Sequence, residues 1–218
     1  MAVVIISGGI GSGKTVVCNM LSEEFGWPVY NADSRVKELY DSHPTLLSDI
    51  ESLFSVSLRD SEGRFRPDAL SAVIFRDKEA LLKVEDLVFP VLKEDFASWQ
   101  STVSDNEFLV LESATILEKP ALVGLGDFVA VVDAPLEMRI ERACNRTGAS
   151  RSSIQARIEL QPLMNMISEG YLPSGVDYLI RNTGDFSQLH RNVLDFMEYL
   201  SGNKNVMNNN KKVKCFYG

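Results

Sequence analysis

One short segment near the start of the chain constrains the fold more than any other. Residues 8–15 read GGIGSGKT and match the pattern G-x-x-x-x-G-K-[ST]. The segment follows an apolar run, Ala2–Ser7, and leads into residues 15–25, where apolar side chains recur at helical spacing. This pattern requires a strand before it and a helix after it. It therefore predicts a strand, a tight loop and a helix at the beginning of an α/β fold.

The residue types in this loop are those that hold a phosphate group. Glycine accepts a positive φ at no steric cost, so successive backbone N–H groups can turn inward around an anion. The Lys14 ammonium can reach the β- and γ-phosphates of a nucleotide, and the Thr15 hydroxyl can bind Mg²⁺. The loop therefore predicts a site for ATP and Mg²⁺. The residues expected to contact the nucleotide are Gly9, Ile10, Gly11, Ser12, Gly13, Lys14, Thr15 and Val16.

Four more apolar runs bounded by turn residues predict buried strands. They lie at residues 28–31, 107–111, 128–132 and 178–180. Helical patterns at residues 136–145 and 186–200 alternate with the later strands. Strands that alternate with helices predict a parallel sheet with helices on both faces.

Residues 34–102 break this alternation, because they carry only helical signals and one turn at residues 60–63. Asp77 is expected to cap a long helix that Pro90 interrupts. We expect a single domain over residues 1–201. Its parts are a core of about 1–33 and 104–201, a helical lobe of about 34–103, a lid of about 145–170, and a flexible tail at 202–218.

Composition excludes some partners. The formal net charge of −8 and the pI of about 4.9 argue against nucleic acid, whose binding needs a basic surface. No apolar run approaches the roughly 20 residues of a membrane span. Cys18, Cys144 and Cys215 are scattered and lack zinc-ligand spacing, and Cys18 is expected to be buried. We expect a cytoplasmic protein; the sequence does not indicate its oligomeric state.

Asp33 follows the second predicted strand, at the edge of the sheet where open α/β folds bind ligands. A carboxylate there can orient an acceptor hydroxyl and take its proton during phosphoryl transfer. The alternative is that Asp33 only caps a helix that begins at Ser34. Spacing alone leaves both interpretations open. A second carboxylate, Asp133, follows the fourth strand and is a candidate for the aspartate that helps to hold Mg²⁺.

Arg139, Arg142 and Arg146 share one face of a predicted helix. A flexible break at residues 147–150 follows them, and further arginines come after it. An arginine-bearing flap of this kind can exclude water and place cations on developing charge. The alternative is an ordinary solvated helix face.

The ordered set of motifs resembles the dephospho-CoA kinase family, from about residue 3 to residue 200. The motifs are GGIGSGK at 8–14, AD at 32–33, DAL at 68–70, IF at 74–75, VVD at 131–133, the arginines of 142–146, ARI at 156–158 with Gln161, and DYLIRN at 177–182. The resemblance implies a P-loop kinase fold with a five-stranded parallel sheet, a helical acceptor-binding insertion and an arginine-bearing lid.

The resemblance also implies the reaction and the roles of individual residues. ATP would phosphorylate the ribose 3′-hydroxyl of dephospho-CoA in the last step of coenzyme A biosynthesis. Asp33 would orient or deprotonate that hydroxyl, assisted by Lys14 and Arg142. Arg142 and Arg146 would contact the ATP phosphates, Asn182 would lie near the adenine, and the helical insertion would bind the acceptor.

Some positions depart from the family pattern, mostly on the acceptor side. Phe89 stands where a histidine is usual, Ala114 where a proline is usual, and Pro67 where an arginine is common. No lysine occurs between Lys119 and Lys204, so a common lid lysine is absent. These departures leave two alternatives: a kinase for a nucleoside, nucleotide or sugar acid, and a nucleotide-binding module without transfer activity.

Overall fold

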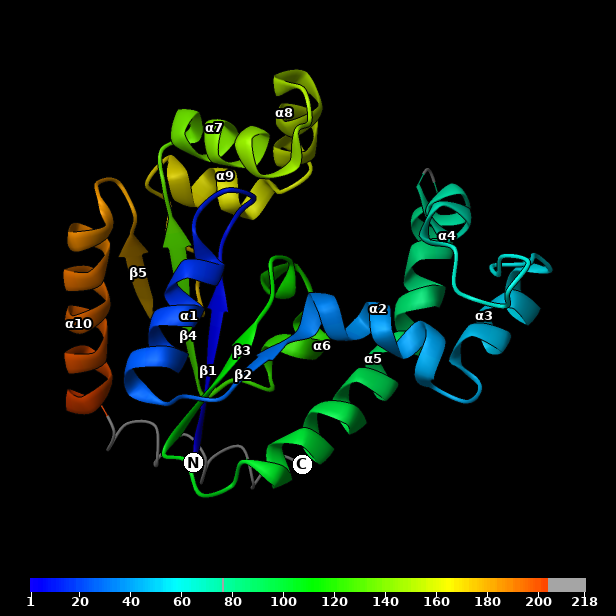
Figure 1. Cartoon of the computed structure of the whole chain (residues 1–218), viewed down its shortest axis with the longest axis horizontal. Helices are drawn as coiled ribbons and strands as arrows, with labels where there is room; N and C mark the ends of the chain where they lie inside the picture. Colours follow the sequence, from blue (N-terminus) through cyan, green and yellow to red (C-terminus); the bar gives the residue numbers. More distant parts are fainter. Residues whose placement is uncertain (76, 204–218) are drawn as a thin grey trace. The chain divides into compact units, whose positions relative to one another are not determined.

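The computed structural model describes residues 1–75 and 77–203, and the predicted tail at 202–218 lies almost wholly outside these residues. The chain divides into two compact units. The first contains Met1–Tyr30 and the chain from Ser104 onward; the second is Asn31–Val103. Each unit is described separately below (Figure 1).

The first unit is built on a five-stranded parallel sheet with the strand order β2-β3-β1-β4-β5. The strands are β1 (Ala2–Ser7), β2 (Val29–Asn31), β3 (Phe108–Glu112), β4 (Phe128–Asp133) and β5 (Tyr178–Arg181). Each lies within two residues of its predicted position. The register places Ile6 beside Glu112 and Asp133 beside Arg181, which brings these strand ends to one edge of the sheet. The predicted fold class is confirmed.

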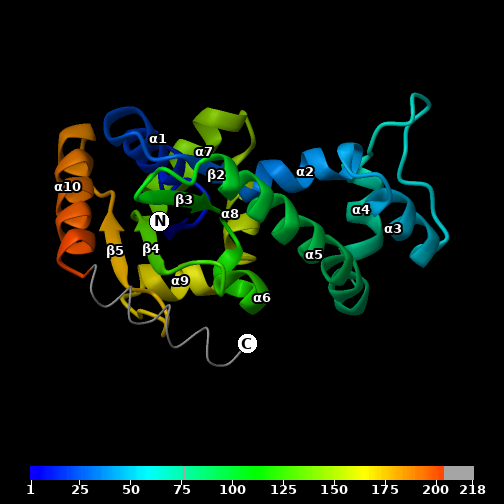
Figure 2. The same cartoon turned by 90° about the horizontal axis from the view of Figure 1, so that it is seen from below.

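Helices cover both faces of this sheet. On one face, α1 (Lys14–Phe25) and α10 (Phe186–Gly202) pack over a core that includes Ala130 and Val132. On the other face, α9 (Pro162–Ser168) packs against Val131, because successive side chains of a strand point to opposite faces. Figure 2 shows α1 and α9 on opposite sides of the strands.

The segment between β4 and α9 forms two packed helices, α7 (Leu136–Thr147) and α8 (Arg151–Glu159). Ile140 and Ala143 of α7 are buried against Ile154 and Ile158 of α8. Gly148 ends α7 with φ 69°, so the predicted break at residues 147–150 is a turn between them. Two short helical turns, η1 (Ile116–Glu118) and α6 (Pro120–Val123), connect β3 to β4.

The second unit is helical, as predicted. It contains α2 (Ala32–Ser42), α3 (Leu46–Phe54), α4 (Pro67–Ile74) and α5 (Lys78–Thr102) (Figure 1). Ala80, Val84, Val88, Leu92 and Phe96 form the buried stripe of α5, each four residues after the last. The guanidinium of Arg35 on α2 donates two hydrogen bonds of 2.7 Å to the Asp95 carboxylate on α5 and fixes the two helices together.

The long helix begins as predicted but does not stop at Pro90. Asp77 caps α5, since its Oδ1 accepts from the N–H groups of Glu79 and Ala80 at 2.9 and 3.0 Å. The expected interruption at Pro90 is wrong, because α5 runs through it. Pro90 is exposed, and so is Asp86, whose carbonyl loses its helical donor. Water can satisfy that carbonyl, while the buried stripe holds the helix together on its other side.

Among the described residues, no helix combines the length and the apolar character that crossing a membrane would require.

Candidate active site

The glycine-rich segment forms a loop between β1 and α1, as the pattern predicts (Figure 1). The loop closes on itself through the Ser12 N–H, which donates to the Gly9 carbonyl at 3.1 Å. Gly11 and Gly13 have φ of 75° and 99°, a left-handed conformation that favours glycine. Gly13 precedes the first residue of α1, so the unpaired N–H groups of the α1 N-terminus open toward the loop. This arrangement is suited to binding an anion.

Other parts of the first unit pack so closely on the loop that side chains cannot replace its glycines. A Cβ on Gly9 would overlap the guanidinium of Arg139, and a Cβ on Gly11 would overlap the Arg139 carbonyl. A Cβ on Gly13 would overlap the side-chain amide of Asn182. The loop is therefore shaped from outside by residues of α7 and of the segment after β5.

Glu112 ends β3 beside the loop and is 5% exposed. The Thr15 hydroxyl donates to its Oε1 at 3.1 Å. Burial, followed by the charge of Glu112, raises the pKa of the nearby Cys18 thiol well above its ordinary value. Cys18 is buried, as the sequence predicts. The position of Glu112 next to Thr15 was not predicted from the sequence; the signal that could have found it is its place directly after a buried apolar run.

Asp133, the other candidate for a role beside the metal, contacts Ser168 and Arg181, and that role stays a prediction. Its Oδ1 accepts from the Ser168 hydroxyl at 2.8 Å, and its Oδ2 lies 3.9 Å from Arg181 Nη1. α1 packs on β1 and β3, so its first turn lies over the end of β3 rather than that of β4.

Arg142 and Asn182 meet beside the loop. The guanidinium of Arg142 donates to the Asn182 carbonyl and side-chain oxygens at 3.5 and 3.3 Å. Asn182 is 5% exposed and donates through Nδ2 to the Ser12 carbonyl at 2.8 Å. The structure thus brings both predicted residues to the loop. Arg146 lies exposed further along α7, and its contact with ATP phosphates stays a prediction.

Arg139 contradicts the interpretation of this helix as a solvated face. Its side chain is 1% exposed, and its Nε donates to the carbonyl of Ile10 in the loop at 3.0 Å. On the other side of the same residue, the Ile10 N–H donates to Gln161 Oε1 at 2.9 Å. Neither contact is predictable from spacing, because Arg139 and Gln161 lie 129 and 151 positions from Ile10.

Asp33 lies in the second unit, exposed in the first turn of α2. It is not the cap of that helix. α2 begins at Ala32, and the Asn31 side chain is the cap, since its Oδ1 accepts from the Ser34 N–H at 2.8 Å. The capping alternative for Asp33 is therefore wrong.

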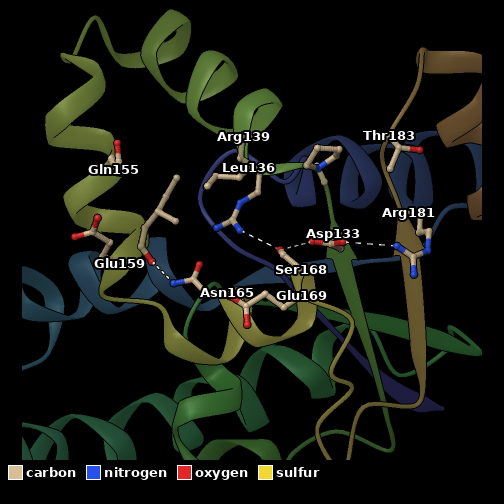
Figure 3. A pocket seen from close by; sticks show the side chains of 13 residues that line it. Asp133, Leu136, Arg139, Gln155, Glu159, Asn165, Ser168, Glu169, Arg181 and Thr183 are labelled. Atoms are coloured by element: carbon tan, nitrogen blue, oxygen red, sulfur yellow. Dashed lines mark hydrogen bonds and ion pairs between the residues drawn. The ribbon is translucent and has the colours of Figure 1, made fainter.

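A cavity of about 490 Å³ opens at the carboxyl ends of β4 and β5, between α7, α8 and α9 (Figure 3). Figure 3 shows Arg139, Ser168, Asp133 and Arg181 in a row along its inner wall, joined by hydrogen bonds and an ion pair. The cavity is lined by Asp133, Ala134, Pro135, Leu136, Arg139, Gln155, Ile158, Glu159, Asn165, Ser168, Glu169, Arg181 and Thr183.

Comparisons with known proteins indicate the family of the chain. A family model described as dephospho-CoA kinase matches residues 2–185. The chain is 35% identical over 182 residues to a dephospho-CoA kinase of Porphyromonas gingivalis, which covers 84% of this chain and 86% of that protein. It is 27% identical over 197 residues to a dephospho-CoA kinase of Neisseria meningitidis, covering 90% and 91%.

Solved structures give the same result for the fold. The protein TT1252 of Thermus thermophilus matches with a TM-score of 0.73 and 26% identity over 91% of this chain and 97% of that one. A dephospho-CoA kinase of Campylobacter jejuni matches with a TM-score of 0.63 and 20% identity over 93% and 98%. The family model over residues 2–185 and the 35% identity to a dephospho-CoA kinase show that the chain belongs to the dephospho-CoA kinase family.

Proposed function

We propose that this chain transfers the γ-phosphoryl group of ATP to the ribose 3′-hydroxyl of dephospho-CoA and so yields coenzyme A and ADP. Membership of the family is the observation that carries the proposal. The alternatives, a kinase for another small acceptor and a module without transfer activity, gain no support from these relatives. The roles proposed below rest on the local geometry of each unit.

The loop binds the phosphates of ATP in this proposal. The left-handed Gly11 and Gly13 shape the backbone around an anion, and the α1 N-terminus adds its positive end. Lys14 supplies a mobile positive charge to the β- and γ-phosphates. In this proposal Asn182 lies on the adenine side of the nucleotide and Arg142 on its phosphate side, and their contact with each other beside Ser12 supports these roles.

Thr15 and Glu112 fit a Mg²⁺ ion. A hydroxyl and a carboxylate oxygen 3.1 Å apart are hard donors of the kind this ion prefers, and ATP phosphates and water supply the remaining ligands. When bound, Mg²⁺ neutralises charge that develops on the phosphates during transfer. Thr15 and Glu112 would hold the ion from the protein side, which extends the proposed metal role from Thr15 alone to this pair.

Asp33 acts on the acceptor. Its carboxylate is exposed in the first turn of α2, which Asn31 caps and the Arg35–Asp95 pair fixes to α5. A helix so anchored holds Asp33 in a defined direction. There it orients the 3′-hydroxyl and accepts its proton as the oxygen attacks the γ-phosphorus, while ADP leaves. The helical unit that carries Asp33 is the proposed acceptor-binding part.

The experiment that tests this function is ADP release from Mg·ATP with and without dephospho-CoA, followed by identification of the product. Lys14→Ala serves as the blank, because it removes the cation that reaches the phosphates. Release that requires dephospho-CoA and yields CoA is the expected result. Intact ATP binding without stimulation would remove dephospho-CoA as the acceptor, and a panel of nucleoside and sugar-acid acceptors would follow.

A further inference from the structure

The backbone N–H and the backbone carbonyl of Ile10 in the loop are both hydrogen-bonded to side chains from outside the loop. Ile10 donates to Gln161 and accepts from Arg139, at 2.9 and 3.0 Å. We propose that Arg139 is a positioning residue for phosphoryl transfer: it keeps the loop in its phosphate-binding shape and holds a positive charge against the back of the loop. This inference rests on the proposed function and deepens it.

The packing around Gly9 supports the proposal. Gly9 is not among the described glycines with positive φ, so its backbone conformation does not require glycine. Its missing side chain has another consequence, since the Arg139 guanidinium occupies the space that a Cβ would fill. The loop and the arginine therefore fit each other at this position, and any side chain at position 9 would displace the guanidinium.

A hydrogen-bonded row sets the orientation of Arg139. Its Nη1 donates to Ser168 Oγ at 3.3 Å, and the Ser168 hydroxyl donates to Asp133 Oδ1 at 2.8 Å. The row joins α7, α9 and the end of β4 along the wall of the cavity in Figure 3. Arg139 thus cannot rotate away from Ile10 without also breaking its contact to Ser168 of α9.

The positive charge of the buried Arg139 guanidinium is only partly balanced by hydrogen bonds and by nearby negative charge. Its Nη2 is buried and has no hydrogen-bond partner within the described residues. Burial lowers the pKa of the guanidinium and the charge of Asp133 opposes that change, but an arginine stays protonated in proteins. A buried cation costs more than an apolar side chain of the same volume. A bound polyphosphate on the far side of the loop would offset that cost.

The test compares Arg139→Gln, Arg139→Lys and Arg139→Met with the natural chain. Calorimetric titration gives the Kd for Mg·ATP and for Mg·tripolyphosphate, which binds the loop without an adenine. Steady-state kinetics give kcat and the KM for each substrate, and a melting temperature is recorded for every variant. Arg191→Gln, at an exposed position of α10, is the matched control for the loss of one positive charge.

We expect Arg139→Gln to raise the Kd of both phosphate ligands about 10- to 100-fold, with the KM for dephospho-CoA within about twofold of the natural value. Arg139→Lys keeps the charge and should recover about half of that loss on a logarithmic scale. Arg139→Met should bind the two phosphate ligands as weakly as Arg139→Gln, or more weakly. The control should bind both ligands as the natural chain does.

Two outcomes would overturn the proposal. One is an Arg139→Gln protein that binds both phosphate ligands within about twofold of the natural chain. The other is an equal loss of affinity for ATP and dephospho-CoA that follows the melting temperature, as a purely structural role requires. If the glutamine and methionine variants do not fold, natural affinity in Arg139→Lys overturns it. Because binding needs no acceptor, the test stands even if dephospho-CoA is not the substrate.

Discussion

The Thr15 hydroxyl donates to the Glu112 carboxylate at 3.1 Å and joins the first turn of α1 to the carboxyl end of β3. The two residues can meet because β3 lies beside β1, the strand that leads into the loop, and Glu112 is in register with Ile6 near the end of β1. A threonine next to the P-loop lysine and an acid on the adjacent strand is an arrangement that suits the binding of Mg²⁺ with a nucleotide.

Glu112→Gln should lower kcat about 100-fold and raise the Mg²⁺ concentration needed for half-maximal rate, because a neutral amide holds the hydrated ion less well. Titration of the rate with Mg²⁺ at fixed ATP measures this. Glu107→Gln is the control, since Glu107 precedes β3 at the opposite end and is exposed. An unchanged Mg²⁺ requirement in Glu112→Gln would assign the ion to other ligands.

Asp33→Asn should lower kcat roughly 10²- to 10⁴-fold while the Kd for Mg·ATP stays within about twofold, because the change removes a proton acceptor and leaves the loop intact. Asp49→Asn is the matched control, since Asp49 also lies in the first turn of a helix, α3. Both variants lose the same favourable charge at a helix start. Equal kinetics in the two variants would remove Asp33 from the chemistry.

Asn182→Ala should lower the free energy of unfolding by about 1–3 kcal/mol, because the Ser12 carbonyl and the Arg142 guanidinium both lose a partner. Chemical denaturation measures the loss. Asn145→Ala, at an exposed site in α7, is the comparison and should be neutral or slightly stabilising, since alanine favours a helix. A loss no larger than that of the comparison would show that the Asn182 contacts do not stabilise the loop.

Gly9→Ala and Arg139→Ala should be strongly non-additive. In the natural background the new methyl group displaces the guanidinium, and the Kd for Mg·ATP should rise at least about tenfold. In the Arg139→Ala background the space is vacant, and the same change should cost less than about threefold. A double-mutant cycle on Kd checks this. Full additivity would mean that Gly9 is constrained by something other than Arg139.

Cys18 should make stability fall at alkaline pH. Its pKa in the folded chain is raised by burial and by Glu112, so the folded chain keeps the proton that the unfolded chain releases above about pH 8.5. The free energy of unfolding should therefore decrease by about 1 kcal/mol between about pH 8.5 and 9.5, and by about 1.4 kcal/mol per pH unit above that. Below that window both states hold the proton and the effect is absent.

Cys18→Ala should remove this slope, whatever it does to the stability at neutral pH. Cys144→Ala leaves Cys18 in place and should retain the slope. Denaturation curves at several pH values give the free energies. A slope that survives in Cys18→Ala would assign the alkaline loss of stability to other groups.

The sheet could be predicted from the sequence because its strands are buried on both faces. Strands such as β4 then consist of continuous apolar residues, and turn residues mark where they end. The loop could be predicted because its glycines and Lys14 act locally, within eight consecutive residues. The helical character of Asn31–Val103 followed in the same way from its apolar periodicity.

The features that could not be predicted from the sequence depend on tertiary packing. Glu112 and Asp133 both follow strands adjacent to β1, and only the packing of α1 decides which of them meets Thr15. Arg139 has the spacing of a surface residue, and only the approach of the loop buries it. Pro90 carries a strong local signal for a helix end, but the buried stripe from Ala80 to Phe96 overrides it.

The chain leaves the first unit after Tyr30 and re-enters it at Ser104, and the two strands on either side of that excursion, β2 and β3, are neighbours in the sheet. The whole helical unit is thus one uninterrupted stretch of coding sequence between adjacent strands. It could be exchanged for the equivalent segment of a relative by one contiguous replacement, without altering the order of the strands. With the acceptor bound by the helical unit, as proposed, acceptor preference and nucleotide handling would diverge on separate segments of one gene.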